Sequence, residues 1–468
     1  MPNQLADILK RLEQLITRDA ESLTDPAERL VEFERRLVRT RDLMTRLGDP
    51  QDAYPIIHIG GTSGKGSVSM ICEAILRASG RRVGTHTTPY LQTPLEKVRV
   101  DGLLVEPDEC LRLGEVVLAC VEAQRAEVER LGSPHYAEAW LGLALRAFAE
   151  QRCDVGVIEV GMGGRFDCTN VVMPRVSAIT TVHYDHIRVL GDTLQEIAGH
   201  KAGIIKPGVP AVAGEMLPEA LTVLEAEAAR QGSRLVRLGH EVRYDPLEVG
   251  ERLGRFTYHG LNVTWDDLHV GLLGAHQFAN AATALAALEL FAESTGLPLD
   301  ETAVRQGLAE VRFAGRIEVM QHRPTVVLDG AHNEEKVGAL AAALPEIFHF
   351  DRLILVLGML EAKNAGPIVE RLADLADLIV TTAPKVRGKP AIPSTELADM
   401  ARGAGRAEVL DDGDPAAALD RALAAAGQND LVVVTGSLYL IGAARSRWQS
   451  VEDILARRTM FPNNIQVK

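Results

Sequence analysis

Residues 60–67, with the sequence GGTSGKGS, have the residue types and spacing of a polyphosphate-binding turn. They follow a short apolar run, 56–59, and they open a segment, 68–78, in which apolar residues recur at helical spacing. A glycine-rich turn between a strand and a helix directs several backbone N–H groups and the positive end of the helix to one point. Lys65 would add a positive charge for the outer phosphates, and Ser67 would offer a hydroxyl to a magnesium ion. We therefore favour phosphate binding over an ordinary glycine turn.

The turn differs from the ordinary P-loop. Gly60 stands one residue too close to Gly64, and Gly66 occupies the position directly after the lysine, where Ser or Thr is usual. The spacing instead gives a shorter pattern, G-T-x-G-K-x-[ST].

Polar residues also follow two later strand patterns. The apolar run at 155–160 contains Glu159 near its end and leads into a glycine-rich turn. The run at 176–182 leads into the sequence HYDH, which ends at His186. A carboxylate at the end of a buried strand destabilises the fold unless it is paired with another group, so its presence there indicates either a partner or a function.

Structural explanations exist for both residues. Glu159 could form an ion pair with Arg165, and His186 could be satisfied by the neighbouring Asp185. Because carboxyl ends of parallel strands meet at one edge of a sheet, we instead predict that Glu159 and His186 join Ser67 as magnesium ligands.

The elements that must position these groups alternate between strand and helix patterns, which predicts an α/β fold with a mostly parallel sheet. Residues 1–48 read as one or two amphipathic helices, with an apolar stripe from Leu30 to Leu47, that would pack on the nucleotide domain as a lid. Residues 234–273 form short alternating pieces, which predict a small antiparallel excursion.

Residues 312–319 (RFAGRIEV) interrupt the helical pattern before them and are the expected hinge. Beyond the hinge, strand patterns alternate again with helical ones and predict a second, smaller Rossmann-like domain; these strands are 325–328, 353–357, 378–382 and 431–435. We therefore divide the chain into residues 1–311, the lid helices and the nucleotide-binding P-loop domain, and residues 312–468, the Rossmann-like domain.

Composition limits the possible partners. A chain of 468 residues should form two or three domains, and its formal net charge of −14 argues against a general affinity for nucleic acids or acidic membranes. The sequence contains no apolar run long enough to span a bilayer and no leader pattern. Five scattered cysteines, without a C-x-x-C pair, fit free thiols in a reducing cytoplasm and imply no structural zinc. We expect a cytoplasmic monomer that acts on small molecules.

Seven ordered strings extend across nearly the whole chain: HIGGTSGKGSVS, EVGMGGRFDCTNVV, YDHIRVLGDTLQEIAGHKAGIIKPG, GAHQFANA, FAGRIEV, LDGAHN and TGSLYLIG. In order and approximate spacing they resemble the folylpolyglutamate synthase and dihydrofolate synthase family, a branch of the Mur ligases. The resemblance implies a Mur-ligase-like fold and ATP-driven amide formation in folate biosynthesis and one-carbon metabolism.

The resemblance also implies roles for individual residues. Lys201 aligns with a family lysine that is carbamylated by carbon dioxide, and a carbamate would turn a cation into an anionic metal ligand beside Ser67, Glu159 and His186. An exposed helical lysine is the alternative for Lys201. Nucleotide contacts are implied for Gly61, Thr62, Ser63, Gly64, Lys65, Gly66, Ser67, Gln277, Asn280, Arg316 and Asp329. Catalytic roles are implied for Lys65, Lys201, Arg316 and His332.

The acceptor half of the motif set departs from the family. The T-S-P-H-L loop carries Tyr90 after Pro89 where the family has histidine, and the family's aromatic-acid pair reads Ala137 and Glu138. Nearby Tyr136 or Trp140 could supply the missing ring. We expect Pro89, Tyr90, Phe166 and Asp167 to contact the acceptor.

The resemblance implies L-glutamate and pteroate or folate as substrates, with ATP and Mg²⁺ as cofactors and a monovalent cation as an optional addition. Two other functions stay open. The chain could be a ligase of the same mechanism that acts on a different carboxylate acceptor, or a catalytically silent nucleotide-binding paralogue.

Overall fold

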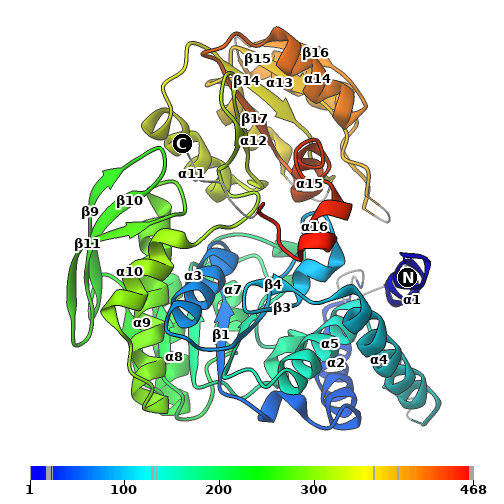
Figure 1. Cartoon of the computed structure of the whole chain (residues 1–468), viewed down its shortest axis with the longest axis vertical. Helices are drawn as coiled ribbons and strands as arrows, with labels where there is room; N and C mark the ends of the chain where they lie inside the picture. Colours follow the sequence, from blue (N-terminus) through cyan, green and yellow to red (C-terminus); the bar gives the residue numbers. More distant parts are fainter. Residues whose placement is uncertain are drawn as a thin grey trace.

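The computed structural model describes residues 2–16, 23, 25–127, 131–132, 134–361, 364–386, 389–405 and 407–462. The chain folds into two lobes, drawn one above the other in Figure 1. The lower lobe contains an eight-stranded and a three-stranded sheet, and the upper lobe contains a six-stranded sheet.

The eight-stranded sheet has the strand order β4-β3-β2-β5-β1-β6-β7-β8. Its strands are β1 (Ile56–Gly60), β2 (Val83–His86), β3 (Arg99–Val100), β4 (Leu103–Leu104), β5 (Val155–Glu159), β6 (Val176–Ile179), β7 (Ala211–Ala213) and β8 (Leu235–Arg237). All neighbouring pairs from β2 to β8 are parallel, and only β3 and β4 run antiparallel at one edge. The prediction of a mostly parallel sheet is therefore confirmed.

The antiparallel excursion is shorter than we expected. It comprises β9 (Arg243–Val249), β10 (Gly254–His259) and β11 (Thr264–Val270). The first expected piece is β8, which instead extends the main sheet by pairing in parallel with β7. Val236 of β8 is fully buried, so this short strand belongs to the core of the large sheet.

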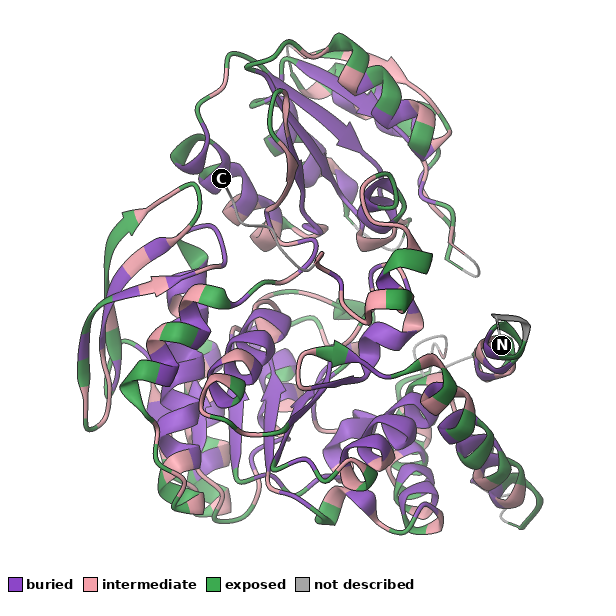
Figure 2. Cartoon of the chain, in the orientation of Figure 1, coloured by how far each residue is buried: buried purple, intermediate pink, exposed green. Residues whose placement is uncertain are grey.

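Helices cover both faces of the large sheet. The helices of the lower lobe are α1 (Pro2–Glu13), α2 (Pro26–Arg46), α3 (Lys65–Ala78), α4 (Pro107–Glu127), α5 (Tyr136–Glu150), α6 (Ile187–Leu190), α7 (Leu194–Ala202), α8 (Pro218–Gln231), α9 (His276–Thr295) and α10 (Glu301–Glu310). Side chains of β1 alternate between the faces: Ile57 and Ile59 pack with α3 and α9, whereas Ile56 packs with α5. Every residue of β1 is buried, and Figure 2 shows the central strands in purple.

The N-terminal helices confirm part of the predicted apolar stripe. Phe33, Met44 and Leu47 are buried, whereas Leu30 is 46% exposed. Asp25 caps α2 by accepting a hydrogen bond from the Ala27 backbone, at 2.8 Å.

The upper lobe is a second α/β unit with the strand order β12-β13-β17-β14-β15-β16. Its strands are β12 (Glu318–Gln321), β13 (Thr325–Leu328), β14 (Leu353–Leu357), β15 (Leu378–Thr381), β16 (Glu408–Asp411) and β17 (Leu431–Thr435). Its helices are α11 (Glu334–Ile347), α12 (Ala365–Ala373), α13 (Ser394–Ala404), α14 (Pro415–Ala425), α15 (Leu438–Arg445) and α16 (Val451–Arg457). Only β12 is antiparallel. The expected α/β fold class is confirmed.

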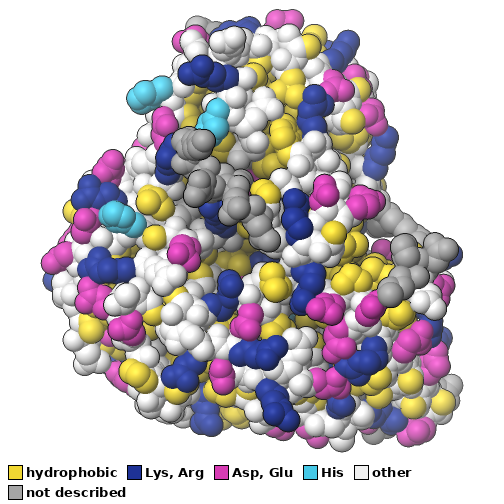
Figure 3. All heavy atoms as spheres, viewed as in Figure 1, with side chains coloured by type: hydrophobic (Ala, Val, Ile, Leu, Met, Phe, Trp, Pro, Cys, Tyr) yellow, Lys and Arg dark blue, Asp and Glu magenta, His cyan; other side chains and the backbone are white. Residues whose placement is uncertain are grey.

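After α16 the chain returns to the lower lobe. The Leu104 backbone donates a hydrogen bond to the Arg458 carbonyl at 2.7 Å, and Figure 1 shows this red segment beside β3 and β4. On the face drawn in Figure 3, Lys and Arg side chains gather around the waist between the lobes. Among the described residues, no helix is long and apolar enough to cross a membrane, and the five cysteines are free thiols.

Candidate active site

One cavity of about 710 Å³ lies between the lobes. Its walls come from the phosphate loop, the carboxyl ends of β2, β5 and β6, the start of α9, the connection between the lobes and the upper lobe. Every expected site residue lines this cavity except Phe166. The strand order brings these groups together, because β2, β5, β1 and β6 are adjacent and end at the same edge.

Two glycines give the phosphate loop its shape. Gly61 has φ +142° and Gly64 has φ +81°, which side-chain-bearing residues rarely adopt. A Cβ at Gly61 would lie 2.0 Å from Thr180 Oγ1, and one at Gly64 would lie 2.2 Å from Asn280 Oδ1. The loop therefore packs directly on β6 and α9, and only glycine fits at either position.

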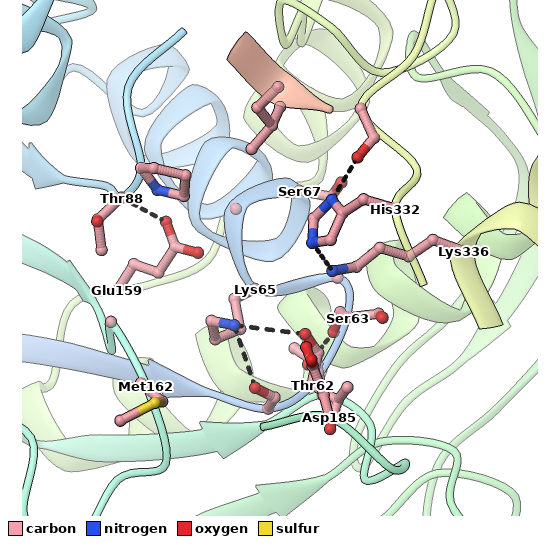
Figure 4. Close-up of a pocket in the computed structure, with 18 of the residues that line it drawn as sticks. Thr62, Ser63, Lys65, Ser67, Thr88, Glu159, Met162, Asp185, His332 and Lys336 are labelled. Carbon is pink, nitrogen blue, oxygen red and sulfur yellow. Dashed lines mark hydrogen bonds between the residues drawn. The ribbon is translucent and has the colours of Figure 1, made fainter. Parts of the chain in front are cut away.

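Lys65 is the first residue of α3 and curls over the loop (Figure 4). Its Nζ donates to the carbonyl oxygens of Gly61 at 3.1 Å and Thr62 at 3.4 Å. A lysine held by its own loop carries its charge where the outer phosphates of a nucleotide would lie.

Glu159 ends β5 with only 4% of its surface exposed. Its Oε2 accepts a hydrogen bond from the Thr88 backbone N–H at 3.0 Å (Figure 4). Burial raises the pKa of this carboxyl, and the nearby Lys65 opposes that rise. Arg165 lies 3.7 Å from Glu227 instead, so the structural explanation for Glu159 does not hold.

Lys201 lies near the end of α7 and is 3% exposed, which excludes the exposed-lysine alternative. Burial, assisted by the charge of Lys65, lowers the pKa of its amine to about 7. A large part of this amine is therefore uncharged near neutral pH, and the uncharged amine is the form that can react with carbon dioxide.

His186 is the least enclosed of the expected metal ligands. It adopts the left-handed conformation (φ 51°) before α6, its side chain is 42% exposed, and its Nε2 lies 3.9 Å from Asp185 Oδ2. No cluster of three or more His, Cys, Asp or Glu side chains within the described ranges could hold a metal by itself. A hydroxyl and a carboxylate, with a carbamate if Lys201 carries one, would form an oxygen donor set of the kind Mg²⁺ prefers, completed by nucleotide oxygens and water. These residues fit the ion.

The start of α9 carries the expected adenine-side groups. Gln277 and Asn280 are buried, and Asn280 Nδ2 donates to Gln277 Oε1 at 2.9 Å. Gln277 Nε2 lies 3.1 Å from His276 Nε2, and His276 also lines the cavity. This amide chain fixes the orientation of both side chains beneath the phosphate loop.

The connection between the lobes presents Arg316. Its guanidinium lies 5.0 Å from the Phe313 ring centroid and donates to the Gly315 carbonyl at 2.9 Å. Asp329 accepts hydrogen bonds from the Ile317 backbone at 2.9 Å and the Ala331 backbone at 2.8 Å. Asp329 therefore orders the segment that carries Arg316 across the cavity.

His332 Nδ1 lies 2.6 Å from the Gly330 carbonyl, and its Nε2 lies 3.4 Å from Lys336 Nζ (Figure 4). A carbonyl can only accept, so Nδ1 carries the proton, and Nε2 accepts a hydrogen bond from Lys336 Nζ.

The lobes contact each other through a residue that sequence reasoning missed. Glu335 accepts a hydrogen bond from Ser63 Oγ at 2.7 Å and lies 3.4 Å from His183 Nε2. Glu335 is the second residue after the LDGAHN string, so the sequence places it near the site, but only the fold shows that it reaches the phosphate loop.

Aromatic and cationic side chains line one end of the cavity. Lys97 is 6% exposed, and its Nζ lies 5.8 Å from the Tyr90 ring centroid and 5.2 Å from that of Tyr136. Burial lowers the pKa of Lys97 to about 8. Across the same cavity, Lys389 Nζ donates to the Tyr439 hydroxyl at 2.9 Å. We define Tyr90, Lys97, Tyr136, Lys389 and Tyr439 as the tyrosine–lysine end.

Two expectations about the acceptor pocket are corrected. Phe166 does not line the cavity, because its ring stacks on Phe33 with centroids 5.4 Å apart. Trp140 is fully buried in the helical core, so of these two aromatic residues only Tyr136 lines the cavity. Asp167 lines the cavity, but it also caps a short turn through the Thr169 backbone at 3.0 Å.

Two family models match the chain. The Mur ligase middle domain matches residues 118–288, and the Mur ligase, glutamate ligase domain matches residues 315–438. A dihydrofolate synthase/folylpolyglutamate synthase of Mycobacterium tuberculosis is 35% identical over 95% of this chain and 94% of its own length. Its counterpart in Bacillus subtilis is 34% identical over 88% of this chain and 94% of its own length.

Solved structures agree with this result. The M. tuberculosis folylpolyglutamate synthase complexed with ADP superposes with a TM-score of 0.87 at 33% identity, covering 95% of this chain and 98% of that one. The E. coli FolC in complex with DHPP and ADP gives a TM-score of 0.81 at 28% identity, covering 97% and 98%.

Proposed function

The chain belongs to the folylpolyglutamate synthase and dihydrofolate synthase family of Mur ligases, and on that premise we propose that it joins L-glutamate to dihydropteroate, to reduced folates, or to both. Members of this family are ATP-dependent ligases. The observation that carries the proposal is the single cavity in which the phosphate loop, Glu159, Lys201 and Arg316 face one another.

The reaction needs ATP because a carboxylate is too poor an electrophile for an amine to attack. A carboxylate oxygen of the acceptor bonds to the γ-phosphorus of ATP, the bond from that phosphorus to the bridging oxygen breaks, and ADP leaves. The glutamate nitrogen then bonds to the acyl carbon, and the carbon–oxygen bond to phosphate breaks. Inorganic phosphate leaves, and the nitrogen loses a proton.

Charge stabilisation is the main contribution of this chain to the first step. Lys65 and the loop N–H groups hold the outer phosphates, and Arg316 stabilises the negative charge spread over the transferred phosphoryl group. Gln277 and Asn280 hold the nucleotide from the α9 side. In the second step, His332 Nε2 exchanges its hydrogen bond with Lys336 for one with the glutamate amine and accepts the proton that this amine loses.

Magnesium is the implied metal cofactor. Ser67, Glu159, His186 and the carbamate of Lys201 would hold it, and Mg²⁺ supplies electrostatic neutralisation of the nucleotide phosphates when bound. Glu159→Gln removes an anionic ligand, so the rate should respond less strongly to added Mg²⁺ than it does in the unchanged protein. A titration of initial rate against Mg²⁺ concentration measures this response.

The tyrosine–lysine end is the proposed acceptor pocket. Tyr90 and Tyr136 can stack against a flat heterocycle, and Lys97 can approach an electronegative edge of that ring or a carboxylate. Pro89 and Asp167 line the same region and complete the pocket.

Phosphate release tests the proposed reaction. Purified protein with ATP and L-glutamate should release phosphate when dihydropteroate or tetrahydrofolate is added, and it should release little without an acceptor. Mass spectrometry should show the acceptor extended by one glutamate residue. Turnover only with a non-folate carboxylate would assign a different acceptor, and no ATP turnover with any acceptor would indicate a silent paralogue.

We also propose a division into residues 1–311 and 312–468, since β12 is the first strand of the upper sheet and the segment before it carries Arg316. The five free thiols support a reducing cytoplasmic setting. We expect a monomer, which sedimentation velocity would test.

A further inference from the structure

A second cavity, of about 160 Å³, lies on another side of α3 and shares no lining residue with the first. Its walls come from α3, from β3 and β4 of the lower sheet, from the end of α10 and from the segment after α16. Thr459, Met460 and Phe461 close it on the side of the upper lobe. The cavity therefore lies at the junction of the two lobes.

Three arginines line this cavity: Arg77, Arg99 and Arg312. None of them forms an ion pair with a carboxylate in the described part of the chain. Arg99 is the most significant, because it is 6% exposed and its Nε has no hydrogen-bond partner. Its recorded side-chain contact is with the sulfur of Met70, which is a weak acceptor. A buried guanidinium that is not hydrogen-bonded to an anion is costly.

The backbone leaves room for the second arginine. A Cβ at Gly102 would lie 2.2 Å from Arg77 Nη1 and 2.5 Å from its Cζ, so the guanidinium lies directly against this glycine. Gly102 has φ +76°, which also disfavours a side chain. Arg312 is exposed beside the Phe461 ring, with 6.0 Å between its Cζ and the ring centroid.

Glu73 completes the polar lining. It is 1% exposed, and neither of its carboxyl oxygens has a hydrogen-bond partner among the described residues. Burial raises the pKa of the Glu73 carboxyl, and the positive charges of Arg99 and Arg77 oppose that rise. The lining thus carries three guanidinium groups against one buried carboxyl, and Glu310, the other acid beside the cavity, is exposed.

We propose that this junction cavity binds a small oxyanion, held by the guanidinium groups of Arg77 and Arg99 with Arg312 at the rim. Guanidinium groups bind phosphate and carboxylate oxygens in pairs, and both kinds of anion fit this chemistry. The volume admits inorganic phosphate or a short dicarboxylate and is too small for a nucleotide.

The site is connected to the active site through two elements. Helix α3 begins at the phosphate loop and carries Glu73 and Arg77 further along. Arg312 directly precedes Phe313, whose ring would lie 2.6 Å from a Cβ at Gly66 of the loop. An anion that orders both segments would therefore change nucleotide affinity, and the nucleotide would change anion affinity by the same factor.

Calorimetric titration of the full chain tests the proposal. Inorganic phosphate and succinate are titrated in separate experiments into protein saturated with AMPPCP and Mg²⁺, which blocks the phosphate position in the first cavity. The compared variants are Arg77→Gln, Arg99→Gln and Arg312→Gln. Arg81→Gln is the matched control, because Arg81 lies close in sequence but outside the cavity lining.

We expect one binding event for at least one of the two anions, and the more strongly bound anion identifies the ligand class. Arg77→Gln and Arg99→Gln should each weaken it at least about tenfold, whereas Arg81→Gln should leave it unchanged. Arg77 and Arg312 are exposed, so their variants decide the question if Arg99→Gln does not fold. The proposal would be overturned if neither anion binds, or if Arg77→Gln and Arg312→Gln both bind the anion with unchanged affinity. Ligase activity is measured separately, so either proposal can fail alone.

Discussion

Burial gives Lys201 its proposed chemistry. A lysine that is 3% exposed would be costly as a lone cation beside Lys65, whereas a carbamate adds the negative charge that the site requires. Lys201→Ala should lower ligase kcat/KM by about 100-fold while the circular dichroism spectrum stays unchanged. Lys10→Ala, an exposed change on α1, is the control. Near-normal turnover of Lys201→Ala would contradict a catalytic role for a Lys201 carbamate.

Carbamylation should also depend on pH. The pKa of Lys201 is lowered to about 7, so its amine is protonated below that value and uncharged above it. At a fixed concentration of dissolved carbon dioxide, carbamate occupancy should rise between about pH 6 and about pH 8. Carbon-13 NMR with labelled bicarbonate measures this occupancy. The carbamate signal should be absent from Lys201→Ala and present in Lys10→Ala.

The proposed role of Arg316 is to stabilise the transferred phosphoryl group. Replacing it with Ala should lower kcat by about a thousandfold, with a much smaller change in the KM for ATP. Arg316→Lys keeps the charge but loses the planar pair of donors, so it should recover only part of the rate. Single-turnover ADP formation separates this effect from product release. A change confined to KM would assign Arg316 to ground-state binding.

At the scale of elements, one buried arginine joins α2 to α5. Arg39 is 2% exposed and donates to Glu138 at 2.6 Å and to Glu32 at 3.1 Å. Arg39→Met would leave the Glu138 carboxylate buried without a partner and should destabilise the chain by about 3–5 kcal/mol. Arg35→Met removes an exposed pair with Glu32 and should cost less than about 1 kcal/mol. Urea unfolding measures both, and equal effects would contradict the account.

The sequence predicted elements best where burial is continuous. The strands β13, β14 and β17 have the predicted bounds, because each is an unbroken apolar run between turn residues. Strand β16 (Glu408–Asp411) was not predicted, since an edge strand with partly exposed residues has no such run. The position of β8 depends on pairing with β7, which no local pattern encodes.

For the candidate site as well, the sequence predicts the motif residues but not the contacts that depend on tertiary packing. Motif residues such as Lys65, Glu159 and Lys201 were predicted to converge, and they line one cavity. Phe166 has the right sequence position but stacks on Phe33, a helix packing that only the fold determines. Lys389 comes from the other lobe, far along the chain, and no spacing rule connects it to Tyr90.

At the scale of the whole molecule, Arg445 connects the lobes. This fully buried residue donates to Glu318 at 2.9 Å, to the Met460 carbonyl and to Gln92 of the lower lobe at 2.7 Å. Arg445→Met should lower the unfolding temperature and separate the unfolding of the two lobes into two calorimetric transitions.

The control for this variant is Arg447→Met, which removes an exposed pair with Asp420. It should leave the calorimetric profile unchanged. A single, unshifted transition in Arg445→Met would show that the lobes are held together by other contacts.

Oxygen transfer tests the central claim most directly, namely that ATP activates the acceptor carboxylate in the cavity between the lobes. Dihydropteroate labelled with oxygen-18 in its carboxylate is converted in the presence of ATP and L-glutamate, and the released phosphate is analysed by mass spectrometry. We predict one labelled oxygen in each phosphate formed, because the acyl-phosphate oxygen leaves with the phosphorus. Unlabelled phosphate accompanied by the glutamylated product would contradict the account.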